Sequence, residues 1–219
     1  MERRMIVSVI GNAACWYENS DPEHKKKWKL AYDLGKTLVD NGFRVLTGGG
    51  RGVMRAAMAG AHASEKYREG DTIAIGPSYD ENDVNDFADI VIATGLDGYR
   101  DNIVANSPVV VAIGGGSGSL REIGSAWKQA RLVIAYTGVE GWSSAFAGQP
   151  LDSNGRYDFP EDKIFSAENA QDVIKIIKKW LPKYNKVLGK LEIGGTAFKE
   201  KCSSNWVGPV ITNKIKTLP

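Results

Sequence analysis

The stretch from Ile113 to Glu122, which reads IGGGSGSLRE, constrains the fold of this chain more than any other. Five apolar residues, Val109–Ile113, come before it, and most of them are β-branched. Apolar residues at helical spacing come after it, namely Leu120, Ile123, Ala126, Trp127 and Ala130. The sequence therefore predicts a strand, a glycine-rich turn and a helix in succession.

Such a turn is suited to an anionic ligand. Glycine has no Cβ, so its backbone can approach a ligand closely. The first turn of the following helix has unpaired N–H groups and carries the positive end of the helix dipole. Both features favour a phosphate group. We therefore predict that the phosphate-binding residues here are Gly114, Gly115, Gly116, Ser117, Gly118 and Ser119.

The same arrangement occurs earlier in the chain. Residues 43–47 read as a strand, and a helix is predicted from Val53 to about Lys66. Between them lie Gly48, Gly49, Gly50, Arg51 and Gly52. Neither glycine turn has the Lys-Ser or Lys-Thr of a Walker loop, and neither matches the dinucleotide pattern G-x-G-x-x-G. We predict that a phosphate lies between the two turns.

The remaining apolar runs predict a series of alternating strands and helices. Strands are expected at 5–10, 72–76, 89–93 and 132–136. Helices are expected from Asp21, as N-cap, to Asn41–Gly42, and at 99–106. A long loop is expected at 138–160, followed by a last helix that Ser166 caps and Pro182 ends.

These strands are short continuous apolar runs, as in a parallel sheet that is buried on both faces. The alternation predicts an α/β fold, a Rossmann-like, doubly wound and mostly parallel sheet with helices on both faces. Ligands of such sheets bind beyond the carboxyl ends of the strands. Both glycine turns fall there, with Gly11 and Asn12 after the first strand. We expect a domain at 1–185 and an irregular extension at 186–219.

Composition excludes several classes of function. The 219 residues carry a net charge of +2, and the longest basic run, Lys25–Lys27, reads as a solvated helix face, so no nucleic-acid partner is expected. The cysteines Cys15 and Cys202 lie far apart, and neither histidine has neighbours at ligand spacing, so we expect no metal site. No apolar run approaches the ~20 residues that span a bilayer, and we expect a soluble, cytoplasmic protein.

The two turns also resemble a known family. Residues 48–54, GGGRGVM, resemble the first signature of the Lonely Guy (LOG) and molybdenum-cofactor-carrier superfamily. Residues 114–122 resemble its second signature, Pro-Gly-Gly-x-Gly-Thr-x-x-Glu. The carrier-like branch is further resembled at Ile75–Pro77, Asn85, Thr94–Gly95 and Arg100–Asn102. The resemblance implies a Rossmann-like fold, a homo-oligomer (dimer or tetramer), and a phosphorylated ligand such as a nucleotide or molybdenum cofactor, with no cofactor required.

The resemblance leaves two functions open. LOG enzymes hydrolyse nucleoside 5′-monophosphates to free base and ribose 5-phosphate, and their catalytic Arg and Glu would here be Arg100 and Glu122. In this chain, however, Gly114 replaces the proline of the signature, Ser119 replaces its threonine, and Arg100 begins an Arg-Asp-Asn run instead of Arg-Lys. These departures favour a binding or carrier protein, with the phosphoribohydrolase as the alternative.

Several of these residues have a structural interpretation beside the functional one. Ser119 and Glu122 are spaced as a capping box, which would account for both without chemistry. Arg100 either pairs with Asp97 or Asp101 at the surface or binds a phosphate. Asn102 either caps a helix or contacts the ligand.

Aromatic residues suggest contacts of a different kind. Trp127 lies in the apolar stripe of the helix after the second turn. We expect a helix flanking the sheet to meet a second subunit, the alternative being a monomer in which Trp127 belongs to the core. Trp142 and Phe146 either stack on a base or pack beneath the loop at 138–160.

Overall fold

The structure is a computed structural model that describes residues 4–14, 21–153, 156 and 159–188. Cys15, Cys202 and almost all of the expected extension at 186–219 lie outside these residues. Residues 186–188 are described, and they continue a helix.

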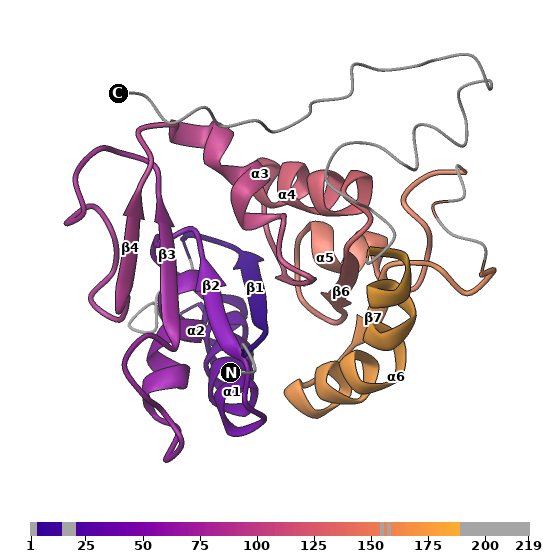
Figure 1. The fold of residues 1–219 in the computed structure, drawn as a ribbon, viewed down its shortest axis with the longest axis horizontal. Helices are drawn as coiled ribbons and strands as arrows, with labels where there is room; N and C mark the ends of the chain where they lie inside the picture. Colours follow the sequence, from indigo (N-terminus) through magenta and orange to yellow (C-terminus); the bar gives the residue numbers. More distant parts are fainter. Residues whose placement is uncertain (1–3, 15–20, 154–155, 157–158, 189–219) are drawn as a thin grey trace, which may run out of the picture. The chain divides into compact units, whose positions relative to one another are not determined.

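In the described part of the chain, seven parallel strands form one sheet, which confirms the predicted fold class (Figure 1). The strands are β1 (Ile6–Gly11), β2 (Arg44–Thr47), β3 (Thr72–Gly76), β4 (Ile90–Ala93), β5 (Val109–Ile113), β6 (Leu132–Tyr136) and β7 (Phe165–Ala167). Their order is β4-β3-β2-β1-β5-β6-β7. In the middle of the sheet, Val7 of β1 is in register with Val45 of β2 and Val109 of β5.

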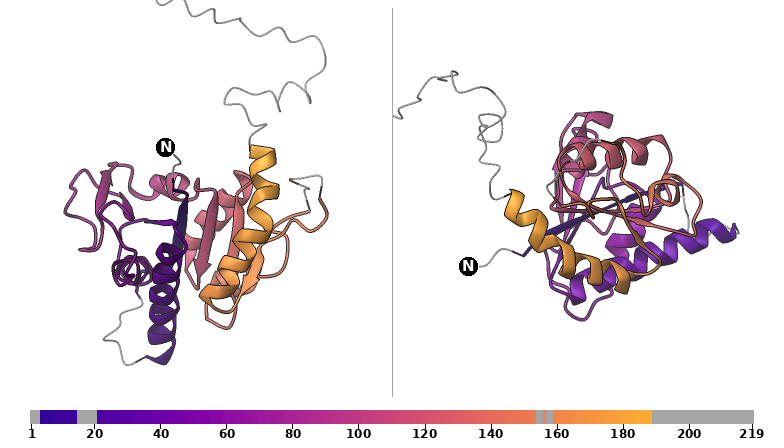
Figure 2. Two further views of the ribbon diagram at one scale, coloured as in Figure 1. Left: turned by 60° about the horizontal axis from the view of Figure 1, so that its bottom comes forward. Right: turned by 90° about the vertical axis from the view of Figure 1, so that its right-hand side faces the viewer.

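Helices cover both faces of the sheet. The helices α1 (Pro22–Asp40), α2 (Val53–His62) and α6 (Ala170–Leu188) pack on one face. The other face carries α3 (Asp101–Val104), α4 (Ser117–Lys128) and residues of α5 (Trp142–Phe146), with the 3₁₀ turn η1 (Asp97–Arg100) leading into α3. The right-hand view of Figure 2 shows α4 on one side of the sheet, and α1 and α6 on the other.

The alternation of side chains along β5 shows why the sequence has continuous apolar runs. Val109, Val111 and Ile113 belong to the core under α1, α2 and α6, whereas Val110 and Ala112 belong to the core under α4. All five residues are buried. At the edge of the sheet β4 differs, because it has a neighbour on one side only and leaves Ile90 and Ile92 exposed.

The helices α1 and α2 touch backbone to backbone. A Cβ on Gly35 of α1 would lie 1.8 Å from the carbonyl oxygen of Ala57, and one on Gly60 of α2 would lie 1.9 Å from that of Tyr32. These two glycines therefore permit a spacing of the helices that no larger residue allows.

Several predicted boundaries were wrong. The helix predicted at 99–106 is the 3₁₀ turn η1 followed by the four-residue α3, and α2 ends at His62 rather than near Lys66. The long loop contains the short helix α5. Ser166 lies in β7 instead of capping α6, since Asn169 takes that role and its Oδ1 accepts the N–H of Asp172 at 3.0 Å.

Pro182 lies inside α6 rather than at its end. A proline removes the hydrogen bond to the carbonyl four residues earlier, here that of Lys178. Both Lys178 and Pro182 are on the exposed side of the helix, so water can bind the freed carbonyl. Packing continues past the proline, because Tyr184 is fully buried and its hydroxyl donates to Asp162 at 2.5 Å.

The basic run Lys25–Lys27 was predicted to be a solvated face, and this is wrong for Lys27. Lys25 and Lys26 are exposed, but Lys27 is buried. Lys27 is buried because of its position along the helix. It lies one turn before Ala31 and two turns before Leu34, on the apolar side of α1.

Candidate ligand-binding site

The candidate site lies where the order of strands reverses direction. From β1 the chain proceeds through β2, β3 and β4 towards one edge of the sheet, and from β5 through β6 and β7 towards the other. At the carboxyl ends of these two central strands, Gly11 is in register with Ile113. Such a reversal leaves a crevice in which open α/β sheets bind their ligands.

Asn12 connects the two glycine turns at this crevice. Its backbone carbonyl accepts the N–H of Val53, the first residue of α2, at 2.9 Å. Its side-chain Oδ1 accepts the N–H of Gly115 in the second turn at 2.5 Å. The turn after β1 is therefore hydrogen-bonded both to the start of α2 and to the turn before α4. This agrees with the prediction that both glycine turns lie at the same edge of the sheet.

The backbone of the second turn explains one departure from the family signature. Gly114 has φ of 62°, a left-handed conformation that proline cannot adopt. Its N–H donates to the hydroxyl of Ser143 at 2.8 Å, and its carbonyl accepts the N–H of the same residue at 3.0 Å. The start of α5 thus supports the turn from behind, and the N–H groups of Gly114 and Gly115 are already engaged.

The next four N–H groups are different. The helix α4 begins at Ser117, with Gly116 as its N-cap. Within the described part of the chain, the backbone N–H groups of residues 116–119 make no hydrogen bond. Gly116, Ser117 and Gly118 are exposed, so an anion could reach these donors and the positive end of the dipole.

The two residues expected to be catalytic lie next to each other. Arg100 Nη1 is 3.5 Å from Glu122 Oε1 and 3.2 Å from Asp101 Oδ1. The guanidinium also packs on the first turn, since a Cβ on Gly48 would lie 2.1 Å from Nη1. The side chain of Arg100 is largely buried. It contacts Asp101, as one of the two interpretations predicted, but this contact does not lie at the surface.

Glu122 is buried and has few partners. Burial, followed by the nearby charge of Asp101, raises the pKa of Glu122 to about 8, against the smaller opposing effects of Arg100 and Arg121. Asp101 is itself occupied, because its Oδ2 accepts from Nε of Arg121 at 2.9 Å and from Nη2 at 2.5 Å. Glu122 is therefore mostly protonated at neutral pH.

The capping-box interpretation of Ser119 and Glu122 was wrong. No side chain caps α4, and the helix starts at Ser117, so Ser119 is already in its first turn. The pattern Ser-x-x-Glu favours a cap only where the serine precedes the helix. Here the glycines before Ser117 let the helix start earlier, and Glu122 lies within the helix, facing Arg100.

Asn102 is not brought to the glycine turns. Its side-chain oxygen accepts the hydroxyl hydrogen of Ser125 at 2.9 Å, and its carbonyl accepts from Gln129 at 3.2 Å. Both partners lie well along α4 from the second turn. Asn102 therefore ties α3 to α4.

A cavity of about 380 Å³ lies on the other side of the first turn. It is lined by Gly49, Gly50, Arg51, Arg55 and residues 82–86. The side-chain amide of Asn85 donates to the carbonyls of Gly49 and Gly50, both at 3.0 Å, and so holds the turn against the loop. Gly48 thus contacts Arg100 while the following residues line the cavity.

A family model matches residues 4–173, which include every strand and both turns. The chain belongs to the SLOG cluster4 family. This agrees with the resemblance that the two glycine signatures indicated.

Relatives of this SLOG protein are found among both sequences and solved structures. An uncharacterized protein of Archaeoglobus fulgidus is 33% identical over 133 residues, which are 60% of this chain and 79% of the relative. The structure titled TM1055 has a TM-score of 0.67 and 26% identity, and covers 80% of this chain and 99% of its own.

Two further similar structures are of proteins whose names include the molybdenum cofactor. The molybdenum cofactor binding protein from Rippkaea orientalis has a TM-score of 0.60 and 30% identity, covering 81% of this chain and 98% of its own. The molybdenum cofactor carrier protein of Chlamydomonas reinhardtii has a TM-score of 0.62 and 30% identity, covering 82% and 99%. The SLOG protein is thus related to proteins that bind a ligand.

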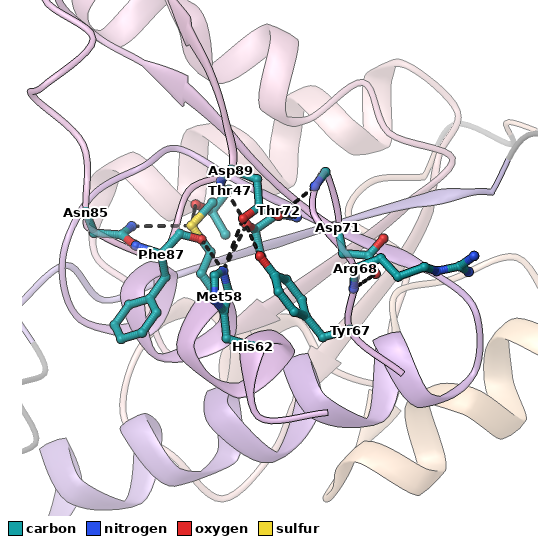
Figure 3. Close-up of polar contacts among 11 residues, drawn as sticks. Thr47, Met58, His62, Tyr67, Arg68, Asp71, Thr72, Asn85, Phe87 and Asp89 are labelled. Atoms are coloured by element: carbon teal, nitrogen blue, oxygen red, sulfur yellow. Dashed lines mark hydrogen bonds and ion pairs between the residues drawn. The ribbon is translucent and has the colours of Figure 1, made fainter. Parts of the chain in front are cut away.

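A second polar cluster lies at the amino ends of β3 and β4, away from the turns (Figure 3). Asp89 accepts hydrogen bonds from the Tyr67 hydroxyl and from the N–H groups of Gly70 and Thr72, at 2.9 and 3.0 Å for the last two. His62 Nε2 is 3.4 Å from the same carboxylate. Burial acts to raise the pKa of Asp89, but the hydrogen bonds from Tyr67 and Thr72 outweigh it and lower this pKa.

Two features are absent from the described residues. No three His, Cys, Asp or Glu side chains of this part of the chain are grouped so that they could hold a metal ion. No helix within it is long and apolar enough to cross a membrane.

Trp127 belongs to the core, whereas Trp142 is 40% exposed and its stacking on a base stays a prediction. Trp127 is buried against the SLOG protein's own sheet, with the guanidinium of Arg156 3.5 Å from its ring centroid. Trp142 and Phe146 stack on each other in α5 at 5.7 Å, and Phe146 also packs against the core. The expected subunit contact through the helix of Trp127 stays a prediction.

Proposed function

We propose that this SLOG protein binds a phosphorylated ligand, a nucleotide or a pterin-type cofactor, and holds its phosphate at the start of α4. The observation that carries the proposal is the run of N–H groups at residues 116–119 at the crevice between β1 and β5. These groups have no protein acceptor among the described residues, and residues 116–118 are exposed. The molybdenum cofactor is a candidate, since two relatives are named for it and its pterin carries a phosphate.

Binding without turnover is favoured by the state of Glu122. Hydrolysis of an N-glycosidic bond develops positive charge on the ribose, and a carboxylate stabilises that charge only when it is ionised. With a pKa of about 8, Glu122 is mostly neutral at pH 7. A protonated Glu122 can donate a hydrogen bond to a bound ligand, which suits a carrier.

The first experiment compares binding with turnover. Wild-type protein is incubated with AMP, GMP, CMP and UMP, with adenosine as the control, while thermal shift and release of free base are both measured. A shift with the monophosphates and no free base supports the carrier. Release of base supports the phosphoribohydrolase, with a rate that rises as the pH passes about 8 and Glu122 ionises. No shift with any phosphorylated compound contradicts the proposal.

A negative charge added at the start of α4 tests whether the phosphate binds there. A Cβ on Gly118 meets no atom within 4 Å, and the same holds for Gly124 of the same helix, so both positions accept aspartate. Gly118→Asp places a negative charge beside the N–H groups, which stabilises the helix but repels a phosphate. We expect it to weaken AMP binding about tenfold or more, whereas Gly124→Asp changes it less than about twofold.

The proposal includes assembly into a dimer or tetramer. Among the described residues, six large side chains around β4, η1 and α3 are exposed although they are apolar or aromatic, namely Tyr79, Ile90, Ile92, Leu96, Tyr99 and Ile103. Exposed groups of this kind are typical of subunit contacts. Sedimentation at micromolar concentration tests this, and a single 23.8 kDa species would contradict it.

A further inference from the structure

Lys27 is buried at the edge of the candidate site, and no part of the proposed function uses it. Only 3% of its surface is exposed, whereas the adjacent Lys25 and Lys26 lie in solvent. A lysine side chain is rarely buried to this extent. Its Nζ nevertheless reaches the surface, because it is not one of the described buried polar atoms that lack a partner.

Lys27 has no hydrogen-bonding or ion-pairing partner among the described residues. Lys26 donates to the carbonyl of Gly138 and Lys29 pairs with Asp33, but Lys27 makes neither a hydrogen bond nor an ion pair there. The backbone N–H of Glu23 lowers the pKa of Asp21 the most, and the charge of Lys27 has the smallest effect on it, without an ion pair. Asp21 caps the helix by accepting the N–H of Glu23, and the Glu23 carboxylate accepts the N–H of Glu140.

The side chain of Lys27 extends to the second glycine turn. Its Cε lies 3.2 Å from the place that a Cβ on Gly114 would occupy. The same place is 2.4 Å from Oδ1 of Asn12 and 2.8 Å from the carbonyl oxygen of Glu140. The end of the lysine is therefore beside the crevice between β1 and β5, next to the turn that leads into α4.

Lys27 and the N–H groups of α4 reach the crevice from opposite faces of the sheet. The N–H groups of residues 116–119 belong to α4, on one face of the sheet, while Lys27 comes from α1 on the other face. An anionic group at the sheet edge could contact both. Lys27 would contribute a full charge, in contrast to the partial charges of the backbone donors.

We propose that Lys27 is a ligand-binding residue whose ammonium group pairs with the phosphate of a phosphate monoester held at the start of α4. The inference rests on the proposed function, and it defines the ligand further. The site selects a dianionic phosphate monoester over the corresponding neutral nucleoside, because an uncharged ligand provides no counter-charge for the ammonium group of Lys27.

The test compares Lys27→Met with Lys25→Met. Both changes remove one charge from α1, but Lys25 is exposed. Binding of AMP, inorganic phosphate and adenosine is measured by calorimetry at constant ionic strength, and circular dichroism verifies the fold. Lys27→Met should weaken AMP and phosphate binding about 10- to 100-fold and leave adenosine binding unchanged, whereas Lys25→Met alters AMP binding less than about twofold.

The outcomes separate the two proposals. If wild-type protein binds neither AMP nor phosphate, both the proposed function and the role of Lys27 are overturned. If the wild type binds AMP and a folded Lys27→Met variant binds it within twofold, the proposed function stands and the role of Lys27 is wrong. Lys27→Gln, which keeps a polar end but no charge, takes the place of the methionine variant if that variant does not fold, and the same thresholds apply.

Discussion

Two carboxyl groups of this protein, the half-buried Asp89 and the buried Glu122, are in opposite electrostatic situations. Asp89, at the amino ends of the strands, accepts hydrogen bonds from Tyr67 and from two backbone N–H groups, and its pKa is lowered. Glu122, on the side of the carboxyl ends, has one contact of 3.5 Å to Arg100, and its pKa is raised to about 8. Asp89 is satisfied by the fold, whereas Glu122 retains hydrogen-bonding capacity that a ligand could use.

The two groups consequently act on stability in different pH ranges. The lowered pKa of Asp89 means that its contribution is present above its ordinary value of 3.8 and is lost as the pH falls through the lowered value. The raised pKa of Glu122 means that the folded state binds the proton more tightly than the unfolded state. Its contribution is full below the ordinary value of 4.5 and is lost as the pH rises through about 8.

The largest effect is expected from Asp89→Asn. The amide cannot accept all the hydrogen bonds that the carboxylate accepts, so buried donors lose their partner. The free energy of unfolding, measured by urea denaturation at pH 7, should fall by about 3 kcal/mol. Asp86→Asn is the matched control, because Asp86 is exposed and its ion pair with Arg55 is long at 3.5 Å. Equal losses in the two variants would show that the cluster around Asp89 does not stabilise the fold.

A smaller effect of opposite sign is expected from Glu122→Gln. The glutamine has the shape of the protonated glutamic acid, so stability at pH 4, below the ordinary pKa of 4.5, should be nearly unchanged. At pH 6 the unfolded wild type has released a proton that the folded state keeps, and the variant has no such proton to release, so the variant should be more stable by on the order of 2 kcal/mol. Thermal denaturation of both proteins between pH 4 and 6 measures this, and parallel curves would show that folding does not raise the pKa of Glu122.

The smallest effect is expected from Tyr67→Phe, which removes one hydrogen bond to Asp89 and leaves its other donors in place. The free energy of unfolding should fall by about 1 kcal/mol. Tyr99→Phe provides the control, because Tyr99 is 82% exposed, and its loss should stay below about 0.3 kcal/mol. A loss as large as that of Asp89→Asn would mean that Tyr67 alone accounts for the stability of the cluster.

The sequence was sufficient for those parts of the fold that depend on local pattern. The apolar runs before Gly11, Gly48 and Gly114 predicted central strands, and the glycines predicted the turns. The three residues of β7 carry no such pattern, and Pro182 is tolerated in α6 only because its surroundings are exposed. Elements of this kind are decided by tertiary packing, which a local pattern does not contain.

The candidate site was predictable in outline but not in its details. The meeting of Arg100 with Glu122 followed from the resemblance, and the structure brings the two together. The role of Ser119 depended on where α4 begins, and a shift of two residues changes a cap into an interior position. Lys27 was missed, although its spacing to Ala31 and Leu34 places it on the buried side of α1.

The close packing of α1 on α2, which Gly35 and Gly60 permit, affects the geometry of the candidate site although both glycines lie away from it. The helix α1 carries Lys27, and α2 begins at the first glycine turn, so the spacing of these helices determines how far the lysine lies from that turn. A single added methyl group at either glycine would collide with backbone and force the helices apart. The distance between Lys27 and the first glycine turn is thus set by two residues inside the protein, and we expect sequence changes there to alter ligand selectivity without replacing any residue that contacts the ligand.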